Sequence, residues 1–222
     1  MNRVIETIDP SGRRVLDVSG LANSAMGARE PVWWGNTLLL CIETTTIVLL
    51  LVSYYYIRRN FDLWPPPQPN TIPSQLHPLP DLALPTAQMI LLLISWLPMY
   101  WTARGAKRDD AGVVKIGLAI MLAINIVLLA LRFLEMRPAH LKFYWDENAY
   151  ASVIWTIVGL HLTYLIAGVA EFFIMFLWVI RHGLDWKHGL DVSLVAIYWY
   201  WVIATWAACY LTVYWGARWL GS

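Results

Sequence analysis

Five stretches of the chain are apolar over enough consecutive positions to cross a bilayer as helices. A spanning helix needs about 20 such residues to cross about 30 Å of hydrocarbon. The predicted spans run at about 36–57, 84–103, 112–134, 150–180 and 192–217. The pattern therefore predicts an all-α, polytopic membrane protein with five transmembrane helices, in which a helical domain over 36–222 follows an inner-side segment over 1–35.

Proline marks the second span and the connection before it. Pro85 falls in the first turn of that span, where a helix tolerates proline, and Pro98 is expected to kink its end. The preceding connection begins Trp64-Pro65-Pro66-Pro67 and continues with further prolines. Such a segment favours extended polyproline geometry, so a loop of about 25 residues is expected here.

Composition supports the membrane assignment and excludes other classes. Hydrophobic residues make up 59% of the chain and charged residues 14%, against roughly 45–50% and about 25% in soluble domains. This excludes a soluble enzyme and a disordered tail. The net charge of +1 gives no basis for nucleic-acid binding. Cys41 and Cys209 are the only cysteines, so a disulfide scaffold and a CxxC metal or redox site are also excluded.

The placement of basic residues predicts the orientation of the chain. With the N-terminus inside, the inner segments hold ten of the 16 Lys and Arg, and the outer segments hold six, with Arg132 counted among the outer residues. The strongest cue is the short basic loop from Arg104 to Arg108. The positive-inside rule therefore predicts a cytoplasmic N-terminus and an outer C-terminus.

Ionisable groups within a bilayer are costly, and Glu43, His161 and Glu171 all fall inside predicted spans. Glu43 must be paired, hydrogen-bonded or protonated there. It is either a structural carboxyl bonded to another helix or a participant in proton or ligand chemistry. His161, Tyr164 and Glu171, together with Gly168, share one face of the fourth span by their spacing. That stripe is either an interhelical packing seam or a proton path.

Metal and cofactor chemistry have too few candidate ligands. A bis-histidine haem needs two facing imidazoles, and His161 is the only histidine well inside a span. Zinc and copper sites lack ligands as well. We therefore expect no catalytic, cofactor-binding or metal-binding residue in this chain. The residues alone predict a five-span membrane protein that is an accessory subunit or a small carrier.

The order of short motifs along 31–219 resembles subunit III of the haem–copper (cytochrome c) oxidases. In that family a buried glutamate, matched by Glu43, follows a tryptophan-rich helix start, and a Gly–His motif, matched by Gly159 to His161, lies in a later helix. The motifs that carry the resemblance are Trp33-Trp34-Gly35, Ile42-Glu43, Trp64-Pro65-Pro66, Phe133-Leu134-Glu135, Asp146 with Tyr150-Ala151-Ser152, Gly159-Leu160-His161 with Gly168, and Tyr198-Trp199 with Trp206.

The chain departs from the family pattern at three positions of its fourth and last spans, in the absence of the family's glycines around Asp146 and Tyr150, and in its number of spans. Tyr164 stands where the family has a second histidine, and Tyr200 and Ile203 replace a histidine and an aspartate of the last helix. Five spans instead of seven indicate a short, divergent form without the first two helices.

The resemblance implies a non-catalytic subunit of an enzyme that reduces O2 and pumps protons in aerobic respiration. Haem and copper are then expected in the catalytic subunit I, which with subunit II and membrane phospholipids is the expected partner. Bound phospholipid and support of proton uptake are further implications, as is a place in a bacterial inner membrane. Trp33 and Trp34 are expected near lipid head groups before the first helix, Glu43 against neighbouring helices, and His161 in hydrogen bonds to another helix, with Tyr164 and Glu171 as further lipid or subunit contacts.

Three other hypotheses remain. In the first, the chain is an accessory subunit of a related nitric oxide reductase or quinol oxidase. In the second it is a small proton-coupled transporter with a relay of Glu43, His161, Glu171 and Asn125. In the third it is a lipid-filled assembly scaffold with no role in turnover.

Overall fold

The computed structural model describes residues 5–8, 14–17, 31–67, 79–184 and 186–219. Five elements in these ranges are long and apolar enough to cross a membrane, which confirms the predicted fold class. They are α1 (Pro31–Arg58), α2 (Ala83–Ala106), α3 (Ala111–Glu135), α5 (Ala149–His182), and a last element that joins α6 (Trp186–Tyr210), the π-helical η2 (Leu211–Gly216) and α7 (Ala217–Trp219).

Three short elements complete the described structure. The helix α4 (Pro138–Leu141) lies between α3 and α5, and β1 (Ile5–Ile8) pairs antiparallel with β2 (Arg14–Asp17). This hairpin in the N-terminal segment was not predicted. The proline-rich loop is described up to Pro67 and again from residue 79, and 68–78 lie outside the described residues.

The predicted spans lie within the observed helices, but several ends were wrong. The helix α1 begins five residues before the predicted span, so Trp33 and Trp34 lie in its first turn instead of before it. Pro31 can occupy the first helical position because the amide hydrogen it lacks has no partner there anyway. The helix α2 continues through Pro98 to Ala106. The last span begins at Trp186 and includes a π-helical turn.

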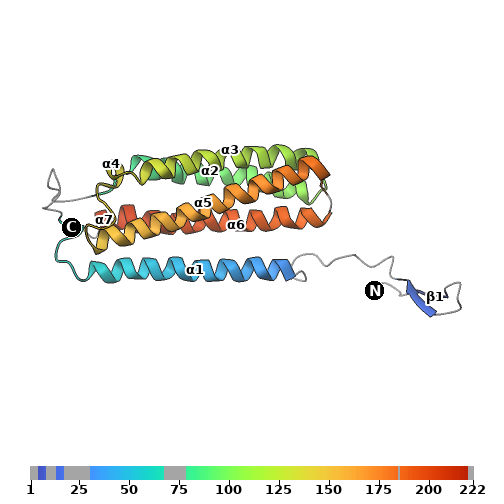
Figure 1. Cartoon of the computed structure of the whole chain (residues 1–222), viewed down its shortest axis with the longest axis horizontal. Helices are drawn as coiled ribbons and strands as arrows, with labels where there is room; N and C mark the ends of the chain where they lie inside the picture. Colours follow the sequence, from blue (N-terminus) through green and yellow to red (C-terminus); the bar gives the residue numbers. More distant parts are fainter. Residues whose placement is uncertain (1–4, 9–13, 18–30, 68–78, 185, 220–222) are drawn as a thin grey trace.

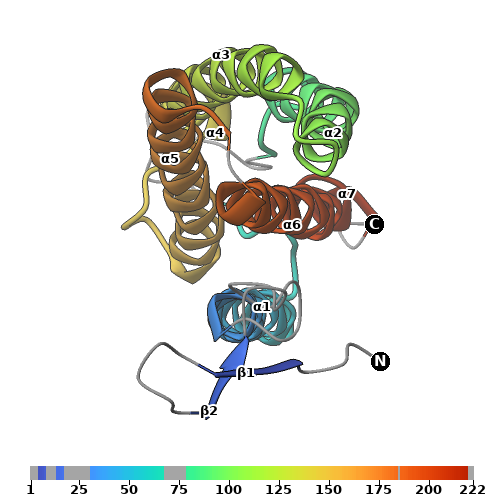
Figure 2. The ribbon, with the colours of Figure 1, turned by 90° about the vertical axis from the view of Figure 1, so that its right-hand side faces the viewer.

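Four of the long helices form a bundle, and α1 stands outside it. Viewed end on, α2, α3, α5 and α6 surround one core (Figure 2). Contacts between α2 and α3, α3 and α5, α5 and α6, and α6 and α2 close this ring, while α1 packs against α5 and α6. Only Ile47 and Tyr54 are buried on α1. The rest of this apolar helix needs lipid or another protein to cover it.

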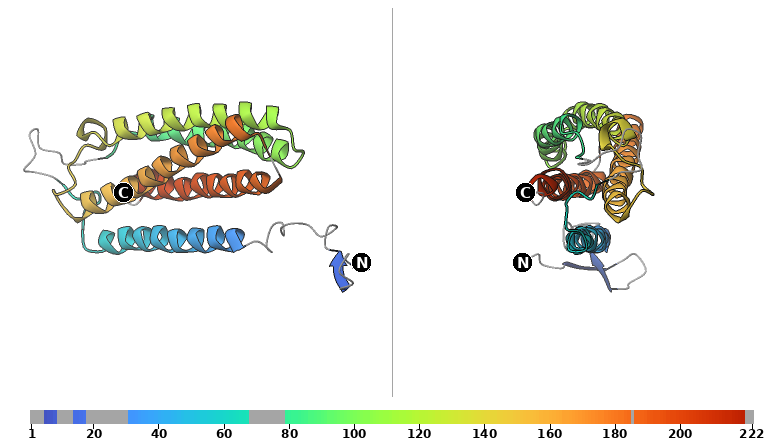
Figure 3. Two further views of the ribbon diagram at one scale, coloured as in Figure 1. Left: turned by 45° about the vertical axis from the view of Figure 1, so that its right-hand side comes forward. Right: turned by 90° about the vertical axis from the view of Figure 1, so that its left-hand side faces the viewer.

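The ends of the helices gather at two opposite ends of the bundle (Figures 1 and 3). The N-side end holds the start of α1 and the α2–α3 and α5–α6 connections, and the C-side end holds the end of α1, α4 and α7. Asp110 caps α3 at the N-side end by accepting hydrogen bonds from the amides of Gly112 and Val113, at 3.0 and 3.1 Å. Which end faces the cytoplasm stays a prediction.

Candidate functional site

A cluster of polar side chains lies buried between α2, α3, α5 and α6, toward the C-side end of the bundle. We call it the arginine cluster, and its members are Gln88, Arg132, Glu135, His161, Trp206 and Tyr214. Arg132 and His161 are fully buried, and Glu135 is 1% exposed. A cation this deep must be paired and hydrogen-bonded to be tolerated.

Glu135 is the acceptor at the centre of the arginine cluster. Its Oε2 accepts from Arg132 at 2.7 Å, three residues earlier on α3, and from the side-chain amide of Gln88 on α2 at 2.8 Å. The Tyr214 hydroxyl of η2 donates to Oε1. Three donors suit an ionised carboxylate, and its charge balances that of Arg132.

The other side of Arg132 meets two rings. Its guanidinium carbon lies 3.6 Å from the centroid of the Trp206 ring, a cation–π contact. Its Nη2 lies 3.0 Å from Nδ1 of His161. Because arginine only donates hydrogen bonds, Nδ1 accepts, so Nε2 carries the proton and faces the Val202 carbonyl at 3.4 Å. His161 thus links α5 to α3 and α6.

Two of the candidate residues, Glu43 and Tyr164, contact each other from different helices, a pairing that was not predicted. The Tyr164 hydroxyl of α5 donates to Oε2 of Glu43 on α1 at 2.7 Å. The tyrosine is held in turn by Tyr198, whose hydroxyl donates to the Tyr164 carbonyl at 3.0 Å. One residue after Glu43, Thr44 accepts a hydrogen bond from the Trp201 indole at 2.7 Å. These contacts attach the middle of α1 to α5 and α6.

The remaining candidates lie apart from these two groups. Glu171 is seven residues beyond Tyr164 on α5, about 10 Å along the helix. Its Oε2 is buried and accepts no hydrogen bond from the described residues. Trp33 and Trp34 contact each other edge to face at the N-side end, with Trp34 53% exposed. The predicted residues therefore do not form one site.

Asn125 of the hypothetical proton relay is fully buried on α3. Its amide lies against Gly168, where an added Cβ would come within 2.7 Å of Nδ2. Within the described ranges, no direct hydrogen bond joins any two of Glu43, His161, Glu171 and Asn125. On the polar stripe of α5, His161, Tyr164 and Gly168 therefore pack against neighbouring helices.

The histidine that the sequence placed inside a span is engaged on both ring nitrogens. Arg132 faces one nitrogen and the Val202 carbonyl the other, so His161 offers no free nitrogen to a metal. Among the residues with described positions, no group of three His, Cys, Asp or Glu side chains is close enough to hold a metal ion.

Sequence reasoning missed the arginine cluster because Arg132 was counted with the cations of the outer segments, whereas the structure buries its side chain within the bundle. The residue lies inside α3, and its i, i+3 spacing to Glu135 places both charges on one helix face. An arginine and a glutamate one turn apart in an otherwise apolar segment were the available signal. Gln88 and Tyr214 carried no such signal.

Comparison with known proteins agrees with the family resemblance of the sequence motifs. The family model described as cytochrome c oxidase subunit III matches residues 22–218. Cytochrome c oxidase subunit 3 from Equus caballus is 24% identical over 143 residues, which cover 64% of this chain and 54% of that protein. The corresponding proteins from Tragelaphus imberbis and Sus scrofa match with the same figures. The chain spans about half the length of the curated relatives it matches.

Proposed function

The chain belongs to the cytochrome c oxidase subunit III family, and from this premise we propose that it is the integral, non-catalytic subunit III of a haem–copper terminal oxidase. Subunits I and II are its partners in this proposal, and the haem and copper that reduce O2 lie in the catalytic subunit. The complex sits in a bacterial inner membrane with the N-terminus of this chain in the cytoplasm. The observation that carries the proposal is the family match over all five spanning helices.

The geometry supports a bracing role. The buried ionisable groups of the arginine cluster hydrogen-bond to one another and to Gln88, and these bonds link neighbouring helices. The helix α1 presents apolar side chains along most of its length, including Leu38, Ile42, Leu49 and Val52, each more than half exposed. A partner subunit and bound phospholipid are the natural cover for such a surface.

The decisive experiment is isolation of the chain with its native neighbours. A tag on this chain, gentle solubilisation and an optical spectrum of the preparation test the proposal. We expect co-purified chains and haem absorbance. A chain that purifies alone and without haem overturns the proposal, and proton or solute flux by the isolated chain in vesicles establishes a transporter instead.

Glu43 gives a sharper test within the assembled oxidase. The proposal predicts that Glu43→Gln leaves the initial rate of O2 reduction nearly unchanged but shortens the working life of the enzyme, because the residue supports proton uptake and packing. Tyr164→Phe removes only the 2.7 Å hydrogen bond to Glu43 and is expected to shorten it less. Tyr56→Phe serves as the control, because Tyr56 lies on α1 with Glu43 and its side chain is 70% exposed. Immediate loss of all activity in a fully assembled complex contradicts this role.

A further inference from the structure

Glu171 is an intramembrane carboxyl without a partner among the described residues. Its Oε2 is buried without a hydrogen bond, and no described ion pair includes it. Its Oε1 accepts no hydrogen bond either but is not buried, so this oxygen lies at the surface of the bundle. The residue stands 11 positions before the end of α5 at His182, about 16 Å along the helix. An unpaired carboxylate at that depth is costly.

The side chains around Glu171 direct this part of α5 outward. Three residues share its side of the helix by their spacing, and all three are exposed: Ala167, Ile174 at 63% and Trp178 at 39%. We call these four residues the Glu171 face. Apolar side chains in a membrane suit lipid as well as protein. The carboxyl among them does not suit lipid, so it is the feature that needs a partner.

The helix α1 carries a donor at the same depth that does not reach Glu171. Asn36 lies seven residues before Glu43 on α1, and its Nδ2 is buried without an acceptor. Glu171 lies seven residues after Tyr164 on α5, which runs in the opposite direction. Because α5 leans away from α1 toward the N-side end (Figures 1 and 3), the contact between Glu43 and Tyr164 is not repeated two turns farther on. On α6, the Tyr198 hydroxyl already donates to the Tyr164 carbonyl.

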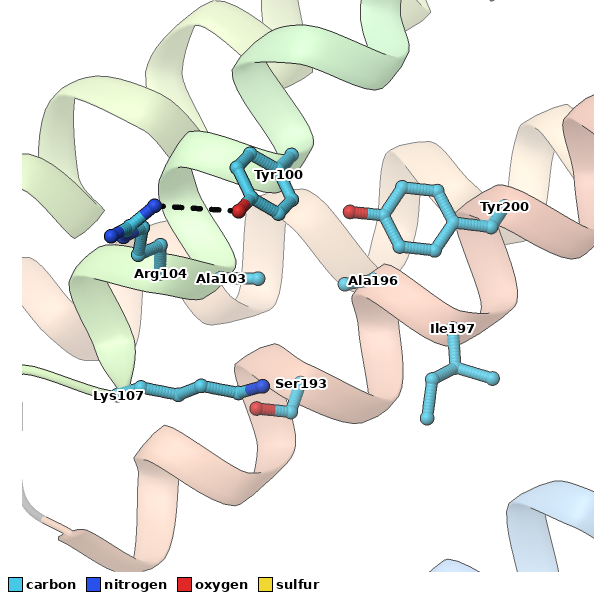
Figure 4. A pocket seen from close by; sticks show the side chains of 8 residues that line it. All are labelled: Tyr100, Ala103, Arg104, Lys107, Ser193, Ala196, Ile197 and Tyr200. Atoms are coloured by element: carbon cyan, nitrogen blue, oxygen red, sulfur yellow. Dashed lines mark hydrogen bonds between the residues drawn. The ribbon is translucent and has the colours of Figure 1, made fainter.

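The cations at the N-side end of this chain are placed elsewhere. Arg104 and Lys107 line a cavity of about 470 Å³ between α2 and α6 (Figure 4), and α2 lies across the ring of helices from α5 (Figure 2). Arg181 follows Glu171 by ten positions on α5, about 15 Å along the helix. Lys115 lies in the second turn of α3, close to the N-side end. A second copy of the chain would carry the same cations at the same depths, so the complement of Glu171 belongs to a different chain.

We propose that the Glu171 face docks a transmembrane helix of a different chain of the assembly, and that a lysine or arginine of this helix pairs with the Glu171 carboxylate. A basic side chain supplies both the donor and the positive charge that the carboxylate lacks. Ala167 allows the close approach of a helix, and Ile174 and Trp178 provide apolar contact area beside the pair. The proposal rests on the proposed function only because it requires a partner chain.

A photo-cross-linker at the Glu171 face identifies the partner. Benzoylphenylalanine replaces Ile174 in the tagged chain, membranes are irradiated, and adducts are identified by mass spectrometry. We expect an adduct with a chain that has lysine or arginine in a transmembrane segment. The matched control places the cross-linker at Ile94, which is 53% exposed on α2, and should not give this adduct. An adduct of two copies of this chain, or adducts with lipid only, overturns the proposal.

Charge variants test the pair itself. After detergent extraction, Glu171→Leu is expected to retain the partner chain about tenfold less than the wild type, because a hydrogen bond to a charged group contributes at least that factor. Glu171→Gln keeps an acceptor without the charge and should lose less. Glu171→Lys should regain the partner when the partner's basic residue is replaced by glutamate. Thr163→Val is the control, since this exposed hydroxyl of α5 bonds only to the Leu160 carbonyl of its own helix.

The haem spectrum of the same preparations distinguishes this proposal from the proposed function. Equal retention of the partner by Glu171→Leu and the wild type, in preparations that contain haem, overturns the docking of this face and leaves the oxidase function standing. A wild-type preparation without haem contradicts the oxidase function, whereas an adduct from position 174 to a basic transmembrane helix still supports the docking.

Discussion

Replacing Glu135 with leucine isolates the energetic role of the arginine cluster. The substitution leaves Arg132 fully buried with its positive charge and without the carboxylate 2.7 Å away. His161 offers that charge an acceptor nitrogen but no negative charge. Removing one partner of a buried ion pair costs about 3–5 kcal/mol. The donors of Gln88 and Tyr214 lose their acceptor as well, which adds to the loss.

The double variant Arg132→Met and Glu135→Leu should recover much of this loss. With both charges gone, no uncompensated ion remains in the core, and apolar replacement of a buried pair is often nearly neutral. We expect the double variant to be more stable than Glu135→Leu alone by about 2 kcal/mol or more. Asp81→Asn is the control, because its contacts with His140 and Lys142 at 3.4 and 3.3 Å join side chains that are 36–40% exposed. It should cost less than about 1 kcal/mol.

The assay is reversible unfolding in mixed micelles by increasing dodecyl sulfate, followed by circular dichroism. Free energies from the wild type, both single variants and the double variant form a complete cycle. The reasoning is refuted if Glu135→Leu lies within 1 kcal/mol of the wild type. It is refuted equally if the double variant loses as much as the two single variants added together.

Two more predictions concern packing and orientation. Gly117→Val should destabilise the bundle by about 1–3 kcal/mol, because a Cβ at Gly117 collides with the Thr102 hydroxyl. Gly35→Ala is the control, because an added Cβ there meets nothing within 4 Å. In the dodecyl sulfate unfolding assay, this control should leave the curve unchanged or shift it slightly toward stability. For orientation, a membrane-impermeant maleimide applied to intact cells should label Trp145→Cys at the C-side end and spare Arg108→Cys at the N-side end; the reverse pattern contradicts the orientation predicted from basic residues.

The spans were predictable because hydrocarbon thickness fixes the length of apolar sequence that a crossing helix needs. Their ends were less so, since an interfacial residue such as Trp33 is compatible with either a helical turn or a preceding loop. The π-helical turn from Leu211 to Gly216 has no counterpart in the hydropathy pattern. Apolar positions there are equally compatible with a regular α-helix.

The candidate residues were predictable one by one, but their pairing was not. Glu43 and His161 stood out because a charge or imidazole in an apolar run is unusual. The contact between Glu43 and Tyr164 joins positions 121 residues apart and depends on how two helices are rotated. In a lipid-facing helix both faces are apolar, so periodicity does not reveal which face meets a neighbour. Arg132 was missed for a related reason, since a cation near a span end resembles an interfacial residue.

The attachment of α1 follows from the same physics. Burial of apolar surface from lipid gives helices little reason to associate, so polar and aromatic contacts carry more of the attachment. For α1 these contacts lie on one side: Glu43 and Thr44 bond to α5 and α6 at mid-depth, and Tyr54 bonds to Trp64 and packs with it on Tyr150 at the C-side end. Interhelical hydrogen bonds in membranes average about 0.6 kcal/mol. A few such contacts fix the rotation of α1 about its own axis. Its opposite apolar face is therefore directed away from the bundle and available to a partner helix.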